Sequence, residues 1–134
     1  MRYSDVVFSG KSGATYRCQV WSLETSFRPV PAAYIVTRRA QSGSNYNSGA
    51  HEVIYIGETS SLADPFATAA DFACFRKHGA TCVCVYRVEH EQLRRKAALD
   101  LAHAHETLCG EKNKIDRLTA PEVPAEAERA ADGA

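Results

Sequence analysis

The sequence has no long hydrophobic run and no excess of charge of either sign. Its 134 residues include 16 Lys and Arg and 16 Asp and Glu, so the formal net charge is zero. No stretch approaches the roughly 18 consecutive apolar residues that a membrane-spanning helix needs. A protein dedicated to nucleic-acid binding usually carries excess positive charge, because neutralising phosphates and releasing their counterions drives binding. These absences argue against a membrane span and restrict any phosphate binding to a local basic patch.

The first residues, MRYSDVVFSGKSG, lack the continuous apolar core of a signal peptide, so we expect a cytoplasmic protein. In that compartment the five cysteines should mostly be reduced thiols. Cys74 and Cys109 are then expected to pack as small apolar residues. The length and the 45% hydrophobic content fit one soluble domain with a modest core.

Turn residues and apolar periodicity predict the order of the elements. Two short strands, 6–8 and 16–21, flank SGKSGA, whose glycines permit a hairpin turn. Further strands are predicted at 33–37, 53–56 and 81–88, with a Gly-, Ser- and Asn-rich mobile loop at 41–50. A helix is predicted to begin with Asp64 as its N-cap and Pro65 at its first position, and to end at Gly79.

A second helix is predicted from about residue 89 to 108. Its expected buried stripe follows spacings of three and four: Leu93, Ala97, Leu101, Ala104 and Leu108. The whole order predicts an α+β fold, a small mixed or antiparallel β-sheet flanked by helices, with an N-terminal β-hairpin. We expect one domain over residues 1–116, in which 1–31 form the hairpin extension, and a flexible Ala-, Glu- and Pro-rich tail at 117–134.

Two segments carry a family resemblance. AAYIV begins at Ala32, IYIGETSSL begins at Ile54, and a helix, a strand and a helix are predicted to follow. Together they resemble a GIY-YIG nuclease domain over residues 32–110. In active members, two tyrosines from the two motif strands line a site with a water, and the resemblance implies Tyr34 and Tyr55 for these roles. It also implies an arginine on the first helix, a metal-binding glutamate on a later helix and an asparagine beyond it.

The arginine, glutamate and asparagine of that pattern are replaced by other residues in this sequence. The resemblance puts the arginine at Pro65, the glutamate at Ala98 and the asparagine at Gly110. Phosphodiester cleavage builds negative charge on oxygen, which a metal and a cation must offset. We therefore expect a catalytically degenerate GIY-YIG-like domain, without a cofactor, that acts by binding a nucleic acid or a protein partner.

Two alternatives keep a chemical role. In the first, the protein is an active endonuclease dependent on Mg²⁺ or Mn²⁺, with Asp100 or Glu58 as a relocated metal ligand. In the second, Cys82 and Cys84 form a thiolate metal or redox site, because residues two apart on a strand share a face. The plainer interpretation of these two cysteines is that they are small core residues.

The candidate binding residues combine the motif positions with nearby basic side chains: Tyr34, Tyr55, Gly57, Arg38, Arg39, Arg76 and Lys77. Arg38 and Arg39 end a predicted strand beside the loop, and Arg76 and Lys77 end the first predicted helix. The run Arg94 to Lys96, with Arg87, Arg76 and Lys77, could form a basic patch for phosphate contacts. The plainer interpretation of this run is the solvated face of the second helix, balanced by nearby acidic residues.

Overall fold

The computed structural model describes residues 2–39, 51–64 and 68–109. In this part of the chain a five-stranded antiparallel sheet has the strand order β1-β2-β5-β3-β4. The elements are β1 (Arg2–Ser9), β2 (Thr15–Ser22), β3 (Ala32–Arg39), β4 (His51–Thr59), α1 (Ala69–Lys77), β5 (Cys82–Arg87) and α2 (Glu91–Ala104). The predicted α+β class, the element order and the N-terminal hairpin are confirmed.

The N-terminal hairpin is part of the same sheet as the motif strands. β1 pairs with β2, and β2 pairs in turn with β5, so the extension adds two strands to one edge of the sheet instead of forming a separate unit. The turn contains Gly13 at φ 92°, a left-handed conformation that suits glycine. The backbone N–H of Gly10 donates to Ala14 O at 2.8 Å and closes the turn.

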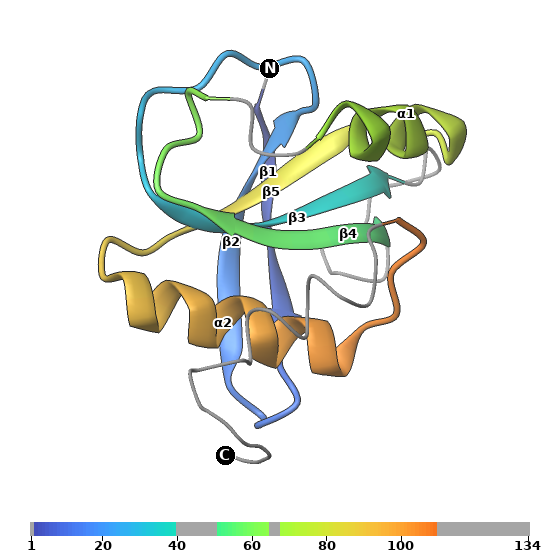
Figure 1. Cartoon of the computed structure of the whole chain (residues 1–134). Helices are drawn as coiled ribbons and strands as arrows, with labels where there is room; N and C mark the ends of the chain where they lie inside the picture. The colour runs from blue at the N-terminus through green and yellow to red at the C-terminus, as the bar shows by residue number, and fades with distance from the viewer. Residues whose placement is uncertain (1, 40–50, 65–67, 110–134) are drawn as a thin grey trace.

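The two helices cover opposite faces of the sheet, with α1 above and α2 below in Figure 1. Successive residues of β3 and β5 alternate between these faces, as strand geometry requires. We call the two apolar layers the α2-side core and the α1-side core. The α2-side core contains Val6, Phe8, Cys18, Val20, Ala33, Ile35, Ile56, Cys82, Cys84, Ala97, Ala98 and Leu101. The α1-side core contains Ala32, Tyr34, Val36, Ile54, Tyr55, Leu62, Phe75, Val83, Val85 and Cys109.

The start of α1 was predicted wrongly. The helix begins at Ala69, with Thr68 as its N-cap, and not at Asp64. Thr68 Oγ1 accepts from the backbone N–H of Asp71 at 3.0 Å, and the Asp71 carboxylate accepts from the N–H of Thr68 at 3.3 Å. This reciprocal capping box satisfies the N–H groups of Thr68 and Asp71 at the start of the helix. The predicted end is confirmed, because His78 caps the helix and Gly79 follows at φ 74°.

The buried face of α2 also differs from the predicted stripe. Ala97 and Leu101 are buried as expected, but Leu93 is 57% exposed and Arg94 is buried in its place. The observed face, Arg94, Ala97, Ala98 and Leu101, still follows helical spacing. It is rotated so that the guanidinium of Arg94 reaches a carboxylate on β4, a partner that apolar periodicity does not reveal.

The helix α2 ends earlier than predicted. It stops at Ala104, and His105 has extended backbone angles. The chain then runs along β4, where Ile54 O accepts the N–H groups of Leu108 and Cys109 at 3.1 and 2.8 Å. This pairing with the edge of the sheet replaces the last predicted turn of the helix, so Leu108 lies outside it and is 47% exposed.

Several sequence predictions fall outside the described residues: the loop at 41–50, Pro65, Gly110 and the tail at 117–134. Within the described residues, no helix has the length and apolarity needed to cross a membrane.

Candidate functional site

The two motif tyrosines lie together inside the α1-side core. β3 and β4 pair so that Tyr34 is opposite Gly57, and the rings of Tyr34 and Tyr55 stack with centroids 6.0 Å apart. Phe75 of α1 covers the pair, with its ring centroid 5.2 Å from that of Tyr55. Tyr34 is 1% exposed and Tyr55 is 6% exposed. The tyrosines therefore meet as the resemblance implies, but they meet beneath a helix.

Gly57 makes this packing possible. A Cβ atom at Gly57 would lie 2.5 Å from Tyr34 Oη and 2.8 Å from Tyr34 Cζ. Such an approach is much shorter than a van der Waals contact, so any larger residue would displace the Tyr34 phenol. The glycine of the motif thus serves the close approach of a tyrosine from the neighbouring strand.

The environment of Tyr34 keeps its phenol neutral. Burial raises the pKa of Tyr34 well above its ordinary value, and the neighbouring Tyr55 and Asp71 raise this pKa further. A phenol with a raised pKa is protonated at neutral pH and does not supply a phenolate that could take a proton from water. Tyr34 therefore has the properties of a buried core residue and not those of a catalytic base.

The position implied for the metal-binding glutamate does not face the tyrosines. Ala98 is fully buried in the α2-side core, whereas Tyr34 and Tyr55 belong to the α1-side core. The sheet separates these two layers. A carboxylate at position 98 would point away from the tyrosine pair in this backbone arrangement.

Glu58, the first candidate for a relocated ligand, is held by arginines of α2. Arg94 Nε donates to Glu58 Oε1 at 2.6 Å, and Arg95 Nε lies 3.9 Å from Glu58 Oε2. The side chains of Arg94 and Glu58 are 6% and 15% exposed. Arg94 was predicted to lie on a solvated face and instead forms the most buried ion pair among the described residues.

Asp100, the second candidate ligand, holds the hairpin turn against α2. Its carboxylate accepts the Ser12 N–H at 2.8 Å, the Ser12 hydroxyl at 2.7 Å and the Tyr16 hydroxyl at 2.6 Å. The hydrogen bonds from Tyr16 and Ser12 lower the pKa of Asp100. Burial and the bond to Asp100 raise the pKa of Tyr16 to about 12. Both proposed metal ligands thus have structural partners.

The basic candidates separate into two groups. Arg38 lies beside the end of α1. Its Cδ is 3.3 Å from the point where a Cβ atom added to Gly79 would lie. Arg76 and Lys77 are exposed in the last turn of the same helix. The ends of β3 and α1 lie on the same side of the molecule in Figure 1. We call Arg38, Arg76 and Lys77 the basic end of α1.

Arg39 points elsewhere. Its guanidinium carbon lies 4.8 Å from the centre of the Tyr3 ring on β1, and the backbone N–H of Arg39 donates to Thr81 Oγ1 at 2.9 Å. The basic end of α1 is partly neutralised, because Glu52 contacts Arg38 at 2.9 Å.

Cys82 and Cys84 share a face, as predicted, and both are fully buried free thiols of the α2-side core. Thr37 Oγ1 lies 3.8 Å from Cys84 Sγ and 2.8 Å from Nδ1 of the buried His51. Burial raises the pKa of both thiols, which disfavours the thiolate that metal binding or nucleophilic attack requires.

A different pair of cysteines was missed. Cys74 and Cys109 form a disulfide, so the prediction that they pack as thiols is wrong. Among the described residues, one group of three potential metal ligands has its ligand atoms within 4.8 Å of one another: Cys74, His78 and Cys109. The spacing of Cys74 and His78, four residues apart on a predicted helix, was an available signal. The position of Cys109 was not, because it depends on where α2 ends.

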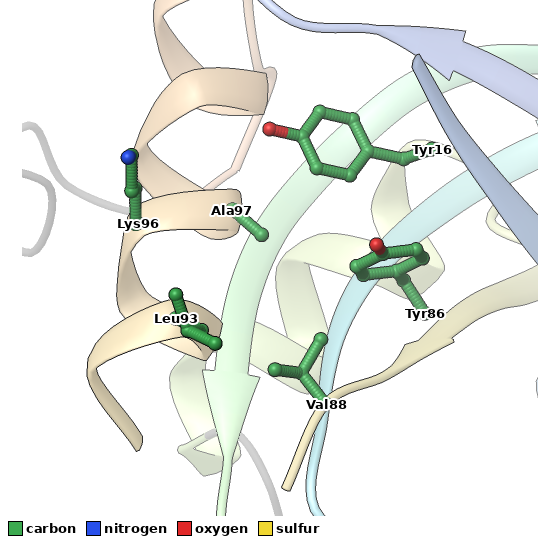
Figure 2. A pocket seen from close by; sticks show the side chains of 6 residues that line it. All are labelled: Tyr16, Tyr86, Val88, Leu93, Lys96 and Ala97. Atoms are coloured by element: carbon green, nitrogen blue, oxygen red, sulfur yellow. The ribbon is translucent and has the colours of Figure 1, made fainter. Parts of the chain in front are cut away.

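A small open pocket lies between α2 and the hairpin side of the sheet. It has a volume of about 230 Å³ and is lined by Tyr16, Tyr86, Val88, Leu93, Lys96 and Ala97. Figure 2 shows the rings of Tyr16 and Tyr86 facing the side chains of α2. These two rings pack edge to face with centroids 5.1 Å apart. The pocket contains none of the candidate residues of the tyrosine site.

In comparisons with known proteins, no family model, no curated protein and no solved structure matches this chain.

Proposed function

We propose that the protein is a catalytically degenerate GIY-YIG-like domain that binds nucleic acid at the basic end of α1 without cleaving it. The observation that carries this proposal is the burial of the tyrosine pair, with 1% of Tyr34 and 6% of Tyr55 exposed. A reacting phosphate and its water need access to both phenols, and a layer of packed side chains occupies that space.

The loss of catalysis has further support on the two faces of the sheet. Ala98 lies in the opposite core layer, and the stray carboxylates Glu58 and Asp100 are held by Arg94 and by the hairpin turn. A metal ion that assists phosphodiester cleavage needs oxygen ligands that converge near the reacting phosphate. Among the described residues, the one group of three potential metal ligands is Cys74, His78 and Cys109, and the Asp71 carboxylate that acts on Tyr34 takes part in the capping box of α1.

Nucleic-acid binding is supported by the basic end of α1. Arg76 and Lys77 are exposed, and Arg38 reaches the same end from β3. Closely spaced cations gain affinity for phosphates by releasing counterions, even where the net charge of the protein is zero. Because the cluster is small and Glu52 partly neutralises it, the affinity should be modest and strongly dependent on salt.

A protein partner is the second candidate, favoured by the zero net charge and by Leu93, which is 57% exposed beside the pocket of Figure 2.

The two candidates are separated by titrating the full chain into labelled single- and double-stranded DNA and RNA at low salt. Binding that the double variant Arg76→Gln, Lys77→Gln weakens, and the matched variant Arg95→Gln, Lys96→Gln does not, supports the nucleic-acid proposal. No binding to any of these nucleic acids contradicts it and favours a protein partner.

A further inference from the structure

The disulfide lies beside an imidazole at the end of α1. His78 follows Cys74 by four residues, which places both side chains on one side of the helix end. Cys109 comes from the segment after α2, where its N–H donates to Ile54 O at 2.8 Å. The three ligand atoms lie within 4.8 Å of one another.

We propose that Cys74, His78 and Cys109 form a redox-controlled zinc site, which binds Zn²⁺ when the cysteines are reduced and releases it when they form the disulfide. This proposal is independent of nucleic-acid binding, since it involves neither the tyrosine pair nor the basic side chains.

The geometry and the chemistry of the group fit zinc. Around a tetrahedral Zn²⁺, with Zn–S of about 2.3 Å and Zn–N of about 2.0 Å, ligand atoms lie roughly 3.5–3.8 Å apart. The group of three is therefore already compact enough, and only small side-chain shifts are needed once the sulfur–sulfur bond is open. Two thiolates and one imidazole leave a fourth position for water or another ligand.

Arg76 and Lys77 lie in the same turn, but the helix dipole and the charges of the two thiolates favour a cation at this place. The group lies at the C-terminal end of α1, where the helix dipole is negative. Two thiolates neutralise the charge of Zn²⁺. Both segments that carry the ligands are anchored by backbone hydrogen bonds, at the end of α1 and at Ile54 of β4, so little chain ordering is needed on binding.

The redox steps balance as follows in a test with a phosphine as the reductant. The phosphine and one water become phosphine oxide, and the two electrons open the disulfide to give two thiols. Zn²⁺ then displaces both thiol protons and binds the thiolates and the neutral imidazole. An added small-molecule disulfide reverses the change: it takes up two electrons and two protons to become two thiols, Cys74 and Cys109 rejoin, and zinc leaves.

The experiment uses the full chain, fully reduced by phosphine without air, and Co²⁺ as a spectroscopic substitute for zinc. We expect the absorption of thiolate-bound tetrahedral cobalt to saturate at one ion per chain, and to vanish when Zn²⁺ or the small-molecule disulfide is added. Even losing a residue that supports a metal ligand costs about 10–100-fold in affinity, so His78→Gln should weaken binding by roughly a hundredfold or more.

Cys109→Ser should remove the cobalt–thiolate absorption, while Cys82→Ala, which changes a thiol of β5 outside the group, should leave it intact. Circular dichroism of each variant establishes that it is folded. Absence of the absorption in the folded, reduced wild type would overturn the proposal. So would absorption that survives Cys109→Ser or is lost in a folded Cys82→Ala protein.

Discussion

Arg94 Nε of α2 lies 2.6 Å from Glu58 Oε1 of β4, and both side chains are largely buried. The pair joins the second motif strand to the helix on the opposite face from the tyrosines. It also explains why α2 buries an arginine where its periodicity predicts leucine.

Replacing Arg94 by alanine should cost about 3–5 kcal/mol in the free energy of unfolding, because Glu58 would remain buried without its closest partner. The matched control is Arg95→Ala. That side chain is 47% exposed and also contacts Glu58, so its loss should cost less than about 1 kcal/mol. Urea denaturation of the three proteins gives the comparison. Equal losses for the two variants would show that the Arg94 pair contributes no more than a surface contact.

Gly57→Ala should destabilise the protein by about 1–3 kcal/mol, since the new methyl group would overpack the Tyr34 phenol. Tyr34→Phe in the same background removes the hydroxyl, which is the atom nearest to that methyl. The double variant should therefore recover part of the loss relative to the sum of the single changes. Thermal or urea unfolding measures all three variants, and strict additivity would contradict the proposed contact.

Stability should fall on acidification because of His51. Burial lowers the pKa of His51, and the charge of Arg39 lowers it further. The unfolded chain therefore takes up a proton near the ordinary pKa of about 6.5, while the folded chain does not until a lower pH. This contribution to stability is fully present above that ordinary value and decreases as the pH falls below it.

The measurement is the urea midpoint at about pH 7.5 and about pH 5.5, on either side of the ordinary histidine pKa. The wild type should lose stability between them, and His51→Gln should lose less. His103→Gln, a change at an exposed position of α2, should behave like the wild type. An equal pH dependence in the His51 and His103 variants would contradict this role of His51.

The fold was largely predictable because strands and turns are encoded locally. Val, Ile and Tyr are concentrated in the motif strands, and glycines mark the hairpin turn and the end of α1. One error missed a local signal, because Thr68 and Asp71, three residues apart, form the capping box that starts α1. The other error depended on a distant partner, since Glu58 on β4 draws Arg94 of α2 into the interior.

The sequence predicted that Tyr34 and Tyr55 lie together, but it did not predict that both side chains are buried. The pairing of Tyr34 with Tyr55 follows from two neighbouring motif strands, but the covering Phe75 depends on how α1 docks. The disulfide was missed for a similar reason. It joins cysteines 35 residues apart that meet only because the chain leaves α2 at Ala104 and returns along β4.

The central claim is that this protein binds nucleic acid without cutting it. It is tested most directly by incubating the full chain with labelled single- and double-stranded DNA and RNA, with Mg²⁺ and then with Mn²⁺. A gel under native conditions separates bound from free molecules, and a denaturing gel separates intact from cut strands. We predict salt-sensitive binding of intact strands that is weakened in the Arg76→Gln, Lys77→Gln protein. Divalent-ion-dependent cleavage that Tyr55→Phe abolishes would contradict the account.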